Sequence, residues 1–108
     1  MTNYNPQELQ QKYEEWCELH RKQLEAQQQF LQAETLLNEL KDYYLNPQWM
    51  ADREADMPIE HSGKEHSIFS EDALWNMLTD RDELARQWMR LGLDAIDRRE
   101  ILNHPNPT

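Results

Sequence analysis

The feature that most constrains the fold is the segment from residue 7 to residue 44, which contains no Pro and no Gly. It is preceded by Asn5 and Pro6, a capping side chain and a residue suited to the first helical turn, and Glu8 can complete a capping box. The side chains of one face recur mostly every three or four residues, with a gap at Gln27. They are Leu9, Tyr13, Trp16, His20, Leu24, Phe30, Leu31, Ala33, Leu37, Leu40 and Tyr44. We therefore predict one helix over residues 6–44.

A helix of that length spans about 58 Å, far more than the diameter of a small globule. It must project, bend, or lie along a partner of similar length, and self-association through this helix is one such arrangement. Only two glycines are present in the 108 residues, and Gln, Glu, Leu, Arg and Ala dominate. Because turn residues and β-branched runs are scarce, strands are not expected.

The rest of the chain is also expected to be helical. Asn46-Pro47 repeats the start signal and predicts a short helix from Gln48 to about Ala55, and residues 57–69 are expected to form a loop. Residues 71–102 are expected to form two helices that meet at a junction over residues 79–83, the first capped by Ser70 and the second capped by Asp80 within that junction. The last helix is expected to end at Asn103-His104-Pro105.

The predicted architecture is a single all-α domain over residues 1–108. It has a long N-terminal helix, a short crossover helix and C-terminal helices that pack back along the first as an antiparallel helical bundle or hairpin.

Three segments, D-Y-Y-L-N-P-Q-W (42–49), D-R-E-A-D (52–56) and S-E-D-A-L-W-N-M-L (70–78), follow one another in a characteristic order and spacing. They resemble a bacterial domain-of-unknown-function family of small acidic helical proteins, over roughly residues 8–90. The resemblance implies a helical fold and no catalytic activity. The histidines of the loop and the extension of the C-terminal helix beyond Met89 depart from the family pattern.

Charge is concentrated in the middle of the chain. The net charge is −10, and residues 52–83 hold ten acidic and three basic residues. This balance disfavours nucleic acid and anionic membranes as ligands and favours a basic protein partner. The pair Arg98-Arg99 is too small to change that expectation.

The loop contains Glu-His-Ser twice, at Glu60 and at Glu65. His61 and His66 are possible zinc or nickel ligands, but they are five residues apart in a glycine-containing loop, which does not match a helical ligand pair. A solvated loop is the expected state, and a metal site is the alternative. His20 is expected in the helical seam rather than as a third ligand.

Asp52, Glu54 and Asp56 alternate along the chain, but the glycine that a calcium loop requires is missing, so an EF-hand is excluded. A charged, solvated face is expected here, with paired catalytic carboxylates as the alternative. Three tryptophans, Trp16, Trp75 and Trp88, lie on apolar stripes and are expected to pack between helices. Trp49 lies beside the acidic segment and is the expected aromatic anchor for a basic partner.

The candidate partner-binding residues are Trp49, Asp52, Glu54, Asp56, Glu71 and Asp72. Neither catalytic residues nor a cofactor or metal site is predicted, since no phosphate-binding loop, nucleophile elbow or zinc framework occurs. With one cysteine, Cys17, no secretory signal and no apolar run long enough for a membrane span, a soluble cytoplasmic protein is expected. The function predicted is a non-enzymatic interaction protein, such as an adaptor, inhibitor or immunity-like factor. A nucleic-acid mimic is the second hypothesis and a metal-dependent enzyme the third.

Overall fold

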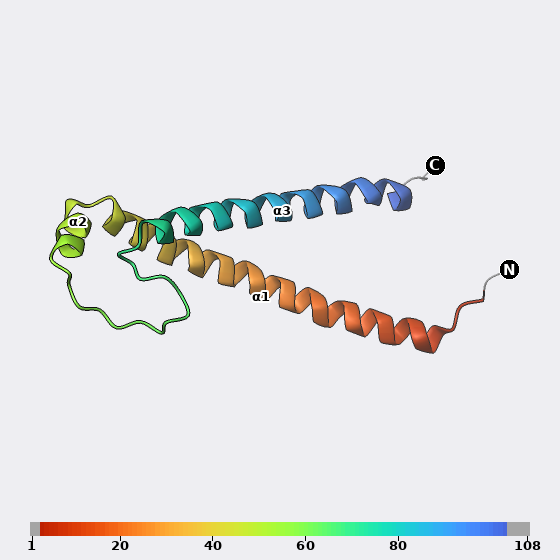
Figure 1. The fold of residues 1–108 in the computed structure, drawn as a ribbon. Helices are drawn as coiled ribbons and strands as arrows, with labels where there is room; N and C mark the ends of the chain where they lie inside the picture. The colour runs from red at the N-terminus through yellow and green to blue at the C-terminus, as the bar shows by residue number, and fades with distance from the viewer. Residues whose placement is uncertain (1–2, 104–108) are drawn as a thin grey trace. The chain divides into compact units, whose positions relative to one another are not determined.

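The computed structural model describes the backbone of residues 3–103 and the side chains through residue 98. Three helices follow in chain order: α1 (Pro6–Tyr44), α2 (Pro47–Glu54) and α3 (Glu71–Asn103) (Figure 1). No strand occurs within residues 3–103. The predicted fold class, all-α with a long first helix, a short second helix and a helical C-terminal part, is confirmed. The predicted end signal at His104 and Pro105 lies outside the described residues.

The start of α1 follows from its capping residue. The Asn5 Oδ1 atom accepts hydrogen bonds from the backbone N–H groups of Gln7, at 2.9 Å, and Glu8, at 3.3 Å. Two N–H groups that have no partner inside the helix are thereby satisfied. The helix then continues for 39 residues, to the bounds expected from the sequence. It stops at Tyr44 because Pro47 opens the next helix and cannot donate a backbone hydrogen bond.

Both ends of α2 are set by local chemistry. At its start the Asn46 Oδ1 atom accepts from the N–H of Gln48 at 2.8 Å. At its end the N–H of Asp56 donates to the carbonyl of Arg53 and the N–H of Met57 donates to the carbonyl of Asp52, both at 3.1 Å. This is a Schellman motif, and its required left-handed residue is Asp56, with φ 52°. Asp tolerates that conformation better than most side chains do.

The segment from residue 57 to residue 70 carries no helix or strand, as expected, and Gly63 takes a positive φ of 81° in its middle. Ser70 closes the loop and opens α3. Its Oγ atom accepts from the N–H of Asp72 at 3.3 Å, and its carbonyl accepts from the N–H of Ala73 at 3.2 Å. The acidic first turn, Glu71 and Asp72, complements the positive end of the helix dipole.

The predicted junction at residues 79–83 is wrong, because α3 is one continuous helix of 33 residues. The segment contains neither Gly nor Pro, and its charged side chains form ion pairs along the helix surface. Arg81 binds Asp82 at 2.8 Å, and Arg86 lies 3.7 Å from Glu83. A side chain such as Asp80 acts as a cap only where free N–H groups exist, and inside a helix they are already bonded.

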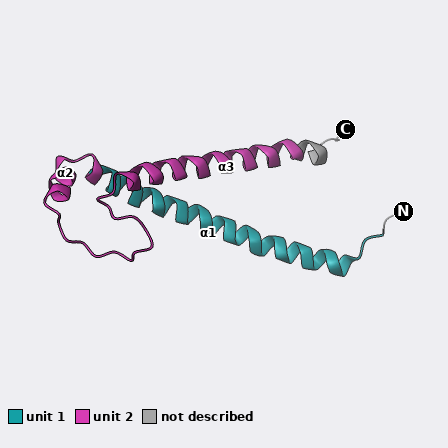
Figure 2. Ribbon diagram, in the orientation of Figure 1, with its two compact units in different colours: residues 1–42 teal, residues 43–108 magenta. Residues whose placement is uncertain are grey.

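The chain divides into two compact units, residues 1–42 and residues 43–108 (Figure 2). The first holds α1 as far as Asp42. The second holds the last two residues of α1, then α2, the loop and α3. The single domain over residues 1–108 stays a prediction.

The distribution of tryptophans differs from the one predicted. Trp16 and Trp75, expected to pack between helices, are 59% and 71% exposed, so that expectation is wrong for these two; Trp88 is 37% exposed, so most of its surface is covered. Trp49, expected on the surface, is only 9% exposed. Leu37 and Trp49 are the two buried hydrophobic residues among the described side chains. Helical spacing identifies an apolar face, but it does not identify which part of that face another element covers.

No helix in residues 3–103 combines the length and the apolar composition that a membrane span requires.

The continuity of α3 predicts opposite results for two substitutions in the same helix. Ser70→Ala removes a side chain that accepts a hydrogen bond from the first turn, so the free energy of unfolding should fall by about 1 kcal/mol. Asp80→Ala should leave it unchanged or slightly higher, because Ala is the better residue inside a helix. Urea unfolding followed by circular dichroism measures both. A loss from Asp80→Ala as large as that from Ser70→Ala would indicate that a helix begins at residue 81.

Candidate functional site

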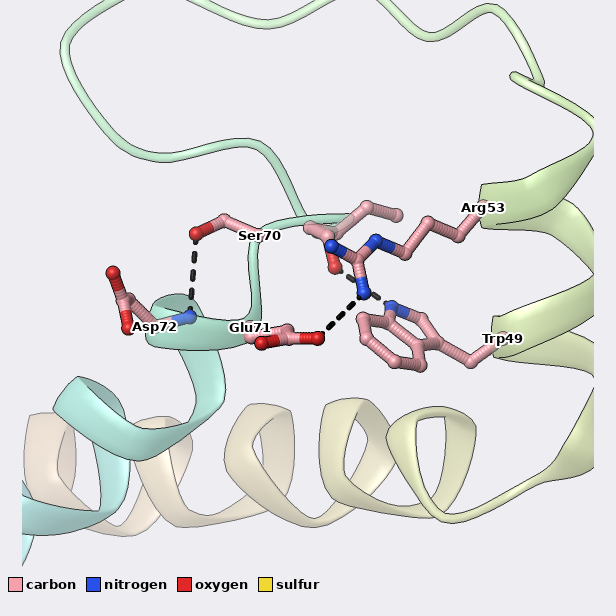
Figure 3. Close-up of polar contacts among 6 residues, drawn as sticks. Trp49, Arg53, Ser70, Glu71 and Asp72 are labelled. Carbon is pink, nitrogen blue, oxygen red and sulfur yellow. Dashed lines mark hydrogen bonds and ion pairs between the residues drawn. The ribbon is translucent and has the colours of Figure 1, made fainter.

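The candidate site is built around Trp49, on the first turn of α2. Its indole Nε1 atom donates a hydrogen bond to the backbone carbonyl of Ile68 at 2.8 Å (Figure 3). Ile68 lies 19 residues further along the chain, just before α3. The bond therefore closes the loop at its base and ties α2 to the segment that leads into α3. Because the indole is buried, its N–H requires this partner.

Arg53 covers the Trp49 ring from the next turn of α2. The guanidinium carbon is 5.5 Å from the ring centroid, within the range of a cation–π interaction. The same guanidinium binds the Glu71 carboxylate, with Nη1 and Oε1 2.8 Å apart (Figure 3). Arg53 thus joins Trp49 to the first residue of α3. The Glu71 side chain of this ion pair is largely exposed, so the pair contributes little to stability on its own.

Tyr43 and Tyr44, at the end of α1, also belong to this cluster. The Tyr43 hydroxyl donates to the Asp52 Oδ2 atom at 2.7 Å, and the same oxygen accepts from the Gln48 side-chain amide at 3.2 Å. The Tyr44 ring lies 5.2 Å from the Trp49 ring with an angle of 50° between them, a favourable tilted arrangement.

The pKa values of the two phenols reflect these contacts. The pKa of Tyr43 is raised to about 12, mainly because its proton is held by Asp52, with smaller contributions from desolvation and from the carboxylate charge. Burial raises the pKa of Tyr44. Both tyrosines therefore remain neutral hydrogen-bonding or packing groups at neutral pH.

The six residues selected from the sequence fall into two groups in the structure. Trp49, Asp52 and Glu71 make contacts within residues 43–108 and help to hold α2 and the start of α3 in place. Glu54, Asp56 and Asp72 are exposed, and none of their carboxylates has an ionic partner among the described residues. Figure 3 shows the Asp72 carboxylate apart from the Arg53 guanidinium.

Sequence reasoning did not identify Tyr43, Arg53 and Ile68 as parts of this cluster. A carboxylate nine residues from a tyrosine, or a carbonyl 19 residues from a tryptophan, has no periodic signature. The adjacency of Arg53 to two acids in the sequence would have suggested an ion pair, but with a neighbour in α2 rather than with Glu71.

The duplicated Glu-His-Ser lies in the exposed part of the loop except for Ser67, which is half-buried and whose Oγ atom accepts a hydrogen bond from the N–H of Phe69 at 3.1 Å. The His61 Nδ1 atom accepts from the N–H of Gly63 at 3.2 Å, and the Ser62 Oγ atom accepts from the N–H of Lys64 at 3.1 Å. These short-range bonds are typical of polar turns. No group of three or more possible metal ligands is found within the described residues. His20 instead stacks on Trp16, with ring centroids 4.9 Å apart.

The structural roles of these residues determine what the site can do. Trp49, Arg53 and the tyrosines hold α2, the base of the loop and the start of α3, and the remaining carboxylates face solvent. The exposed carboxylates of Glu54, Asp56 and Asp72 therefore project from a backbone that these contacts hold in place.

Comparison with known families supports the resemblance seen in the sequence. A family model described as Domain of unknown function (DUF4298) matches residues 7–91, which include α2, the loop and most of α3. Searches of curated proteins and of solved structures return no match.

The burial of Trp49 predicts that it, and not the exposed tryptophans, contributes to stability. Trp49→Ala should lower the free energy of unfolding by about 3 kcal/mol or more, since it removes a buried side chain and leaves the Ile68 carbonyl without its partner. Trp75→Ala is the matched control, because it removes the same side chain from an exposed helical position, and it should have little effect. Urea unfolding compares the two. Equal losses would contradict the packing role of Trp49. If Trp49→Ala does not fold, Trp49→Phe tests the hydrogen bond with less loss of volume.

The raised pKa of Tyr43 predicts a pH-dependent contribution to stability. An unfolded tyrosine ionises near pH 10, whereas Tyr43 in the folded chain ionises at about 12. The unfolded state therefore loses its proton first, so the stabilisation is complete below about pH 10 and is lost as the pH rises to about 12. The free energy of unfolding of the parent should approach that of Tyr43→Phe over this range. A difference that stays constant with pH would show that the hydrogen bond to Asp52 does not form.

Proposed function

The chain belongs to the DUF4298 family, and on that premise we propose that it is a non-enzymatic interaction protein whose acidic surface binds a basic surface of another protein. The proposed surface, which we call the acidic surface, comprises Glu54, Asp56, Glu60, Glu65 and Asp72 with the apolar side chains Met57 and Ile59.

The observation that carries the proposal is that pairing within the chain leaves these carboxylates free. Of the three basic residues between positions 52 and 83, Arg53 binds Glu71, Arg81 binds Asp82, and Lys64 has no ion pair among the described residues. The five carboxylates of the acidic surface are exposed and have no ionic partner within the part of the chain that the structure describes. Carboxylates gathered in one part of the chain repel one another, and binding of a basic partner would relieve that repulsion.

Two exposed apolar side chains lie between carboxylates of this surface in the sequence. Met57 is 46% exposed and Ile59 is 39% exposed, and Asp56 precedes them and Glu60 follows them. Burial of such side chains at the centre of an interface slows dissociation, while surrounding charges accelerate association. Methionine adapts easily to the shape of a partner. Trp49 supports this surface indirectly, because it holds the base of the loop.

The test compares two triple variants with equal change in net charge. The first is Glu54→Gln, Asp56→Asn and Glu60→Gln, in which Asn keeps the tolerance for the left-handed conformation at position 56. The control is Glu25→Gln, Glu39→Gln and Asp94→Asn, which neutralises three exposed carboxylates outside the acidic surface. Asp52 and Glu71 are left unchanged because they have structural contacts.

We expect the first variant to associate with a basic partner, isolated by affinity capture on the parent protein, about tenfold more slowly at low salt. Its association rate should also depend less on ionic strength, whereas the control should resemble the parent. Surface plasmon resonance over a range of salt concentrations measures both rates.

Equal effects of the two triple variants, or salt-independent binding, would contradict a localised acidic surface. Competition with duplex DNA for the same partner tests the second hypothesis, that the chain is a nucleic-acid mimic. Displacement of the chain by DNA would indicate that the acidic surface imitates nucleic acid.

A further inference from the structure

The N-terminal half of α1 carries a heptad pattern that is distinct from the acidic surface. Residues at alternating intervals of three and four form a seam that we call the α1 seam. It comprises Leu9, Lys12, Trp16, Leu19, Gln23 and Ala26. The large apolar members are well exposed: Leu9 is 44%, Trp16 59% and Leu19 49% exposed.

Trp16 is held in a defined orientation. The His20 ring stacks on it with 9° between the ring planes and 4.9 Å between the centroids. A side chain that is already ordered loses less entropy when a partner covers it, so this exposed indole is suited to an interface.

Two free charges lie along one edge of the α1 seam, one position before Trp16 and one position before Gln23. They are Glu15 and Lys22, both exposed and both without an ion-pair partner among the described residues. They are seven residues apart, so they are not neighbours on the same helix. Glu18 and Arg21, by contrast, are already paired with each other.

We propose that the α1 seam pairs with the α1 seam of a second copy of this chain in antiparallel orientation, with the two-fold axis between Trp16 and Leu19. In this register Trp16 packs against Leu19 of the second copy, and Lys12 faces Gln23 of the second copy. Antiparallel pairing brings the same edges of two helices together, so Glu15 lies beside Lys22 of the second copy. The two-fold symmetry produces each of these contacts twice.

The charges select this register over its neighbours. A shift of one heptad toward the N-terminus places Glu15 opposite Glu15 of the second copy. A shift of one heptad toward the C-terminus places Lys22 opposite Lys22 of the second copy. A shift of two heptads toward the C-terminus would require Leu37, which is already buried. In a parallel pair in register, Lys12 would face Lys12 in the seam itself. Only the antiparallel register centred between Trp16 and Leu19 combines apolar contacts with two opposite-charge pairs.

The area available corresponds to a reversible dimer. The exposed side chains of the α1 seam and its edges, chiefly Trp16, Leu19 and Leu9, offer on the order of 500 Å² per copy, or about 1,000 Å² in total, which is the lower limit for a specific interface. A concentration-dependent equilibrium between monomer and dimer is therefore expected, without a permanent assembly.

A charge swap tests both the partner and the orientation. Glu15→Lys should weaken the dimer roughly tenfold, because it places two lysine side chains beside each other at both symmetry-related positions, and Lys22→Glu should do the same with two acids. The double variant, Glu15→Lys with Lys22→Glu, should restore the parent dissociation constant, because each pair is again opposite in charge. Sedimentation equilibrium over a range of concentrations measures all four chains. Circular dichroism confirms that each is folded.

Substitution of the central tryptophan provides a second measurement. Trp16→Ala should weaken the dimer, whereas Trp75→Ala, which removes an exposed tryptophan from α3, should not. A chain that is monomeric up to about 1 mM, a weak limit for specific association, would overturn the proposal. A dimer whose double variant is as weak as the single variants would also overturn it, because the partner edge would then not be the one proposed.

Discussion

The hydrogen bond from the Trp49 indole to the Ile68 carbonyl is the contact on which the rest of residues 43–108 depends. It joins α2 to the residue before α3 and leaves the intervening loop exposed but anchored at its base. Arg53 lies over the same indole and holds Glu71, and Tyr44 packs against the indole from the end of α1. Removal of this one side chain would therefore remove the contacts with Ile68, Arg53 and Tyr44 together, whereas the Tyr43–Asp52 and Arg53–Glu71 contacts do not involve the indole.

The contacts around Trp49 involve some of the nearby carboxylates and leave others exposed to solvent. Asp52 and Glu71 are used to hold Tyr43 and Arg53, while Glu54, Asp56 and Asp72 have no ionic partner in the described part of the chain. The same backbone that is fixed by the first two carboxylates presents the other three to solvent. Preorganised charge of this kind costs little entropy on binding, which is the physical basis of the proposed interaction with a basic protein.

The two proposals rest on different segments and different forces. The acidic surface depends on an excess of negative charge in α2, the loop and the start of α3. The α1 seam depends on exposed apolar side chains and on the complementary pair Glu15 and Lys22, all within residues 9–26. They share no residue, so each can be tested with substitutions that leave the residues of the other unchanged.

The sequence by itself determined where α1 and α2 begin and where the loop lies, because Asn5, Asn46 and Pro47 act through bonds to residues two or three positions away. It also determined the charge distribution. The tertiary structure decided that Trp49 is buried while Trp16 and Trp75 are exposed, since helical periodicity defines a face but not what covers it. It also decided which carboxylates are structural, because the contacts of Asp52 with Tyr43 and of Glu71 with Arg53 depend on the path of the chain between distant positions.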